Sequence, residues 1–91
     1  MNIKYAWLLT SLGKPSYEEI ELCKLVIKHE AGFLGRGYEL DRIDKGAHDI
    51  WNLYYDGECI FAIQETDDGY GICHIEKGRI SDALRYLQSR D

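Results

Sequence analysis

Cys-x-x-Cys pairs, proline and long apolar runs are absent or scarce in this sequence, and each of these features excludes a class of protein. The three cysteines include no Cys-x-x-Cys pair, so we expect neither a disulfide framework nor a metal site. The single proline, Pro15, and the lack of any repeat or low-complexity tract give no sign of a linker between domains. No apolar run approaches the ~18 residues that a membrane-spanning helix needs, and the first residues lack a signal-peptide pattern.

Positive charge is also scarce. The sequence has 11 Lys and Arg against 16 Asp and Glu, a formal net charge of −5, so we expect neither nucleic acid nor a membrane surface as a partner. A hydrophobic content of 45% over 91 residues is too high for a disordered chain and sufficient for one core. The sequence therefore predicts a single domain over residues 1–91, located in the cytoplasm, where its thiols stay reduced.

Two helices are predicted from capping and spacing. Ser16 is followed three residues later by Glu19, a capping-box pattern, and apolar residues then recur at helical spacing to about Ala31. Near the C-terminus a second helical stripe consists of Ile80, Ala83, Leu84 and Leu87. Residues 2–12 fit either a short helix or a strand, and the helix is preferred.

Between these helices the period changes to that of a sheet. The glycine-rich segment 32–37 is expected to be a turn, and four strands are predicted between Tyr38 and Ile75. Turn signals separate these strands at Lys45-Gly46, at Asp56-Gly57 and at residues 66–69. The predicted fold is α+β: a two-layer sandwich of order (α)αββββα, with a four-stranded antiparallel meander and the helices packed on one face.

A trial register follows from the turn lengths. It places Leu53 opposite Ile60, Ala62 opposite Cys73 and Leu40 opposite Trp51, which assigns Tyr38, Cys73 and Ile75 to the core as well. The opposite face then carries an apolar patch with an acidic rim, which is typical of a docking surface. We predict that its contact residues are Ile50, Tyr54, Phe61, Ile63, Tyr70 and Ile72.

Three kinds of cover fit this patch, and we predict a homodimer rather than a monomer. A second copy of the chain would form a homodimer with Phe61 near the two-fold axis, since closed dimers are the commonest oligomers. Alternatively, the N-terminal segment with Trp7 and Leu8 folds over the same face. A foreign protein partner is the third possibility.

No convincing catalytic set emerges. The nearest is a thiol, an imidazole and an amide, Cys59, His74 and Asn52, which the trial register places near one another on the second face. Their diagonal spacing of ~7–8 Å exceeds hydrogen-bonding reach. We therefore predict no catalytic residues and no cofactor, and a cysteine-dependent enzyme is the alternative.

The leading hypothesis is thus a small non-catalytic interaction protein, and its concrete form is a protein of the inhibitor or immunity type or an accessory protein of a phage or mobile element. A further alternative is a small-ligand-binding domain with a cavity among Tyr38, Trp51 and Cys73. That alternative is disfavoured because a domain of this length has little core volume to spare.

Overall fold

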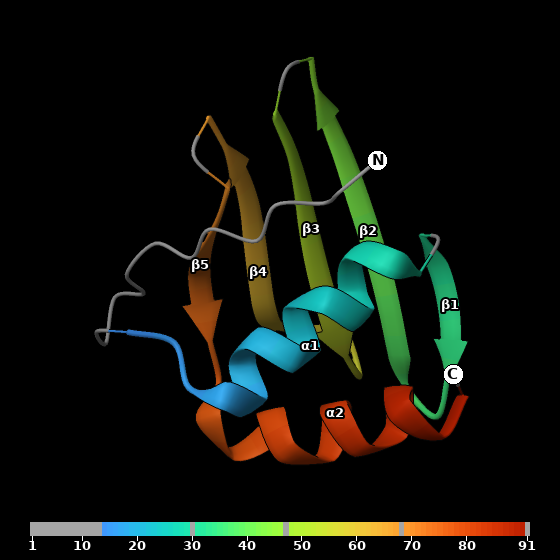
Figure 1. Ribbon diagram of the computed structural model, residues 1–91. Helices are drawn as coiled ribbons and strands as arrows, with labels where there is room; N and C mark the ends of the chain where they lie inside the picture. The colour runs from blue at the N-terminus through green and yellow to red at the C-terminus, as the bar shows by residue number, and fades with distance from the viewer. Residues whose placement is uncertain (1–13, 30, 47, 68, 91) are drawn as a thin grey trace.

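The computed structural model describes residues 14–29, 31–46, 48–67 and 69–90. Two helices and five strands follow one another along the chain, and the strands form one antiparallel sheet in sequence order (Figure 1). The elements are α1 (Tyr17–Lys28), β1 (Gly32–Gly35), β2 (Tyr38–Lys45), β3 (His48–Tyr55), β4 (Glu58–Thr66), β5 (Gly69–Ile75) and α2 (Lys77–Arg90).

The predicted α+β class, with helices on an antiparallel meander, is confirmed. The sheet has one strand more than predicted, because Gly32–Gly35 pairs with β2 instead of forming only a turn. The interpretation of residues 2–12, and that of Trp7 and Leu8 as a cover, lie outside the described residues.

Helix α1 begins where its capping box predicts. The Ser16 side chain accepts a hydrogen bond from the Glu19 amide, and the Glu19 carboxylate accepts one from the Ser16 amide, both at 3.2 Å. The helix ends at Lys28, earlier than the predicted end near Ala31, because His29 already has extended backbone angles. Its buried side consists of Glu19, Leu22, Cys23 and Val26.

The sheet register differs from the trial register at two β-bulges. The Asp56-Gly57 hairpin pairs Tyr55 with Glu58 as predicted, but Leu53 then faces Phe61, so Ile60 is an extra residue in β4. In β5 the extra residue is Cys73, since Ala62 pairs with His74 and Ile63 pairs with Ile72.

The first hairpin also turns one residue later than predicted. Lys45 pairs with His48, so Leu40 lies opposite Leu53 rather than Trp51. This change of partner is a shift of two residues and keeps the same faces. A β-bulge instead shifts a strand by one residue, which exchanges its two faces, so the bulges decide which side chains reach the core.

The predicted contact patch is therefore wrong for four of its six residues. Phe61 and Ile63 are fully buried, Tyr70 and Ile72 nearly so, and all four belong to the core cluster. Cys73, predicted to be buried, is exposed instead, so it does not line a core cavity with the buried Tyr38 and Trp51. Of the predicted contacts, Ile50 and Tyr54 remain partly accessible.

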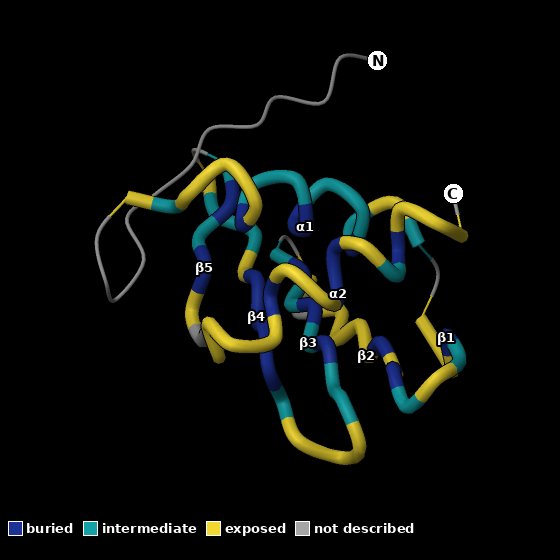
Figure 2. Tube along the Cα trace, turned by 90° about the horizontal axis from the view of Figure 1, so that it is seen from below, coloured by how far each residue is buried: buried dark blue, intermediate teal, exposed yellow. Residues whose placement is uncertain are grey.

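The core lies between the sheet and the helix layer. In Figure 1, α1 crosses in front of the sheet and α2 runs below it along one end of the strands. Figure 2 shows buried positions on both helices and on the central strands, with exposed positions at the turns and along the outer side of α2. The predicted stripe of α2 is confirmed: Ile80, Ala83, Leu84 and Leu87 are all buried. Neither described helix is long and apolar enough to span a bilayer.

Candidate binding site

The sheet face opposite the core, here called the open face, has no described helix against it (Figure 1). The strand pairing places its residues in rows across the sheet, because directly paired residues share a face. One row runs from Phe33 through Glu39 and Tyr54 to Cys59. The next two rows are Asp41, Asn52 and Ala62, and then Ile43, Ile50 and Gln64.

Apolar surface is left exposed on this face. The Phe33 side chain is 76% exposed and that of Ile43 is 37% exposed. Large apolar side chains with this exposure would be more stable in contact with another surface, by ~1.5–3 kcal/mol each if they were fully buried. Phe33 lies opposite Glu39, and Ile43 follows Asp41 on the same face of β2, so both apolar side chains are next to carboxylates.

An acidic hollow occupies the part of the open face nearest β1. It is an open depression of about 630 Å³ whose lining includes Glu39, Asp41 and Tyr54, together with Ala31 and Gly57. Partial burial raises the pKa of the Tyr54 hydroxyl above its ordinary value, and Cys59, Asp41 and Glu39 raise it further. The carboxylates of the hollow thus disfavour a further negative charge there and favour the binding of a cation.

The three residues of the alternative catalytic set are not arranged as the trial register placed them. Cys59 lies opposite Tyr54 as predicted, but Asn52 lies opposite Ala62 rather than Phe61, and His74 also pairs with Ala62. The Cys59 thiol has a hydrogen bond to the Phe61 carbonyl oxygen, at 3.8 Å.

The other two thiols are not activated. Burial, and then the nearby Glu19 carboxylate, raises the pKa of the Cys23 thiol far above its ordinary value. Partial burial raises the pKa of the Cys73 thiol. A raised pKa lowers the thiolate fraction and so the reactivity of a cysteine. Within the described ranges, no group of three or more His, Cys, Asp or Glu side chains could hold a metal ion.

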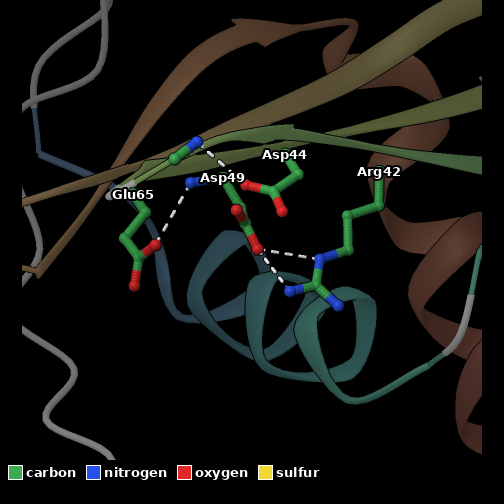
Figure 3. Close-up of polar contacts among 5 residues, drawn as sticks. Arg42, Asp44, Asp49 and Glu65 are labelled. Atoms are coloured by element: carbon green, nitrogen blue, oxygen red, sulfur yellow. Dashed lines mark hydrogen bonds and ion pairs between the residues drawn. The ribbon is translucent and has the colours of Figure 1, made fainter.

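A polar cluster lies on the core side of the β2–β3 hairpin, next to α1 (Figure 3). The Arg42 guanidinium donates to the buried Asp49 carboxylate through Nε at 2.8 Å and also through a second nitrogen, and it lies 5.8 Å from the centre of the Trp51 ring. The Asp49 amide donates to Glu65 on β4 at 3.1 Å. Because the buried carboxylate has its counter-ion on the neighbouring strand, this cluster joins three strands and is explained by the fold.

A second surface was missed by the sequence reasoning. A groove of about 670 Å³ between α2 and the ends of β2 and β3 is lined by Arg36, Tyr38, Tyr55, Asp82, Arg85, Tyr86 and Ser89. The residues that line the groove come from distant parts of the sequence. Only those on α2 have a spacing of three to four residues, which indicates that they share one face of that helix.

Comparisons with protein-family models, with curated proteins and with solved structures found no match to this chain. The assignment of function therefore depends on the surfaces themselves.

Proposed function

We propose that this protein is a cytoplasmic, non-catalytic protein-interaction module that binds a basic segment of another protein on its open face. The single observation that supports the proposal is the acidic hollow, in which Glu39 and Asp41 lie beside the Tyr54 ring. A lysine or arginine of a partner would meet two carboxylates there, and an aromatic ring adds a cation–π contact. Phe33 and Ile43 supply apolar contact area around it.

A basic partner suits this face better than a second copy of the chain. Two copies meeting face to face would bring their Glu39 and Asp41 carboxylates into one interface, and like charges brought together cost several kcal/mol. The homodimer predicted from the sequence would bury Ile50, Phe61, Ile63 and Ile72, and all of these except Ile50 are already buried within their own chain. An inhibitor or accessory protein acting on a basic enzyme is the form of the proposal that fits this charge.

The test compares two charge reversals at exposed positions. Protein from the native host that is retained by the wild-type chain is purified, and its affinity is measured by calorimetry against the wild type, Asp41→Lys and the matched control Glu76→Lys. Both positions are exposed, so both variants change the charge equally without disturbing the core. We expect Asp41→Lys to weaken binding about tenfold or more and Glu76→Lys to leave it nearly unchanged.

The dependence of affinity on ionic strength, and the molecular mass of the protein alone, provide the second part of the test. Binding by the acidic hollow weakens as ionic strength rises, because exposed charges are screened. Binding that survives Asp41→Lys, or a light-scattering mass of twice the chain's 10.5 kDa in the absence of a partner, would overturn the proposal.

A further inference from the structure

The groove beside α2 has the size and the walls of a small-molecule site. Its volume of about 670 Å³ lies within the ~300–1,000 Å³ that is typical of ligand pockets. One side is the face of α2 that carries Asp82, Arg85, Tyr86 and Ser89. It shares no lining residue with the acidic hollow, so it is a separate surface from the proposed docking face.

The groove has an aromatic floor. The Tyr38 ring lies between two others, with its centre 5.2 Å from that of Tyr86 in a stacked arrangement and 4.9 Å from that of Tyr55 in a tilted one. Tyr38 is buried, whereas Tyr55 and Tyr86 are only partly buried and line the groove. Accessible aromatic surface of this kind binds planar rings, at ~1–3 kcal/mol per stacked base.

Positive charge gathers around this floor although the chain as a whole is acidic. Of the five arginines in the sequence, only Arg42 lies elsewhere. Arg36 and Arg85 line the groove, and the guanidinium carbons of Arg79 and Arg90 lie 4.7 Å and 5.9 Å from the ring centres of Tyr55 and Tyr86.

Acidic side chains are also present, but they are outnumbered. Asp82 lines the groove with an oxygen 3.9 Å from a guanidinium nitrogen of Arg85, and Asp56 belongs to the neighbouring turn. Two arginines and one aspartate line the groove itself, so its lining carries a net positive charge, which favours an anion.

The walls of the groove are held in place by close contacts. The Tyr86 hydroxyl donates to the Leu34 carbonyl oxygen at 2.8 Å, and a Cβ on Gly35 would lie only 2.6 Å from that hydroxyl. The Asp56 amide donates to the Gly37 carbonyl oxygen at 2.9 Å, which joins the β1–β2 turn to the β3–β4 turn. A site built from such fixed parts binds with a smaller loss of conformational entropy.

Arg36 itself points to a role beyond the turn. It occupies the first central position of a two-residue hairpin turn with φ 53°, followed by Gly37 with φ 85°. That position favours Asn, Asp or Gly, and the equivalent position of the β3–β4 turn is indeed Asp56. An arginine there breaks a local preference without a visible structural gain, which is typical of functional positions.

We propose that this groove binds a nucleoside phosphate, with its base on the tyrosines and its phosphate between Arg36 and Arg85. The guanidinium fork matches phosphate oxygens in a bidentate geometry. The Asp82 carboxylate offers an acceptor to a ribose or to a base amine. The Ser89 hydroxyl, which donates to the Tyr86 carbonyl oxygen at 2.7 Å, offers its oxygen as a second acceptor. An acidic peptide would use the arginines but would leave the aromatic floor without a planar ring.

Calorimetry with adenosine monophosphate, adenosine and inorganic phosphate tests this proposal. We expect the nucleotide to bind about tenfold more tightly than either of its parts, because only the nucleotide uses both the rings and the arginines. A short single-stranded oligoadenylate distinguishes the two sources of this chemistry. Affinity about tenfold above that of the mononucleotide assigns the site to a strand, and equal affinity assigns it to a free nucleotide.

The matched variants are Arg36→Asn/Arg85→Gln in the groove and Lys14→Gln/Lys77→Gln outside it. Both remove two positive charges from exposed positions. The groove variant should lose about tenfold or more in nucleotide affinity, while the control should stay within about twofold. Asparagine suits the backbone at position 36, so the loss of binding should occur in a chain that melts no lower than the wild type.

Three results would overturn the proposal: nucleotide affinity equal to that of adenosine, equal affinity in the groove and control variants, or displacement of the nucleotide by a glutamate-rich peptide at lower concentration. None of them bears on the open face. Asp41→Lys, which tests the docking proposal, should retain nucleotide binding.

Discussion

Arg36 has a backbone conformation that disfavours an arginine, and the proposed nucleotide site gives a reason for its presence. Its φ of 53° lies in the left-handed region, which costs an ordinary L-residue roughly 1–2 kcal/mol and asparagine less. We therefore expect Arg36→Asn alone to stabilise the fold by about 0.5–1 kcal/mol, measured by urea unfolding. Arg85→Gln, which changes the same charge on a helix, should stay within about 0.5 kcal/mol. A lower stability for Arg36→Asn would mean that the arginine side chain supports the turn.

Phe61 and Phe33 are the two phenylalanines, and they have opposite environments. Phe61 is fully buried and Phe33 is 76% exposed. Phe61→Ala should cost about 3–5 kcal/mol through lost burial and a cavity, whereas Phe33→Ala should change stability by less than about 0.5 kcal/mol. Urea unfolding of both variants checks this. An equal cost at the two positions would show that the open face is covered.

At the scale of elements, α1 depends on its first turn. Ser16 satisfies the Glu19 amide, which would otherwise have no partner within the helix. Ser16→Ala should destabilise the fold by about 1 kcal/mol, and Ser16→Asp should keep most of that stability because its carboxylate caps equally well. Thermal unfolding monitored by circular dichroism distinguishes the two. If both variants melt together below the wild type, the hydroxyl itself has another role.

Elements with a local chemical signal could be predicted from the sequence. The capping box at Ser16, the Asp56-Gly57 hairpin and the stripe of α2 each depend on residues a few positions apart, and each is confirmed. The bulges at Ile60 and Cys73 have no such signal, since either residue would also fit a regular strand. Their positions depend on packing against elements elsewhere in the chain, and that packing turned Phe61 inward.

The groove could not be predicted for a related reason. Arg36, Tyr55 and Arg85 come from a turn, a strand and a helix, and no spacing in the sequence connects them. The net charge of −5 is a sum over the whole chain. It therefore indicates neither the arginines of the groove nor the carboxylates of the acidic hollow. A sum over the chain describes the whole molecule but not its separate surfaces.

For the whole molecule, stability should fall at alkaline pH. Burial raises the pKa of the Cys23 thiol and, to a smaller extent, that of the Tyr38 hydroxyl. In the unfolded chain the thiol ionises near its ordinary pKa of about 8.5, whereas the native state holds the proton. The stabilisation is therefore complete below about pH 8.5 and declines as the pH rises above it.

Urea unfolding between neutral pH and about pH 10 measures this decline. Cys23→Ala is less stable at every pH because it leaves a cavity, but it should lose most of the slope that begins near pH 8.5 and keep the smaller part that comes from Cys73. The tyrosine contribution, which begins near pH 10, should remain in that variant. An unchanged slope in Cys23→Ala would show that another group controls the alkaline limit.

The order of the elements also has a consequence for biosynthesis. Each strand pairs with its neighbour in sequence, so every hairpin can form soon after it leaves the ribosome. The two helices are the exception, because α1 precedes all the strands and packs against α2, which follows them (Figure 1). The buried side of α1 therefore stays partly uncovered until α2 has been synthesised; its apolar residues are Leu22, Cys23 and Val26. Until then, α1 lacks the helix that completes its layer.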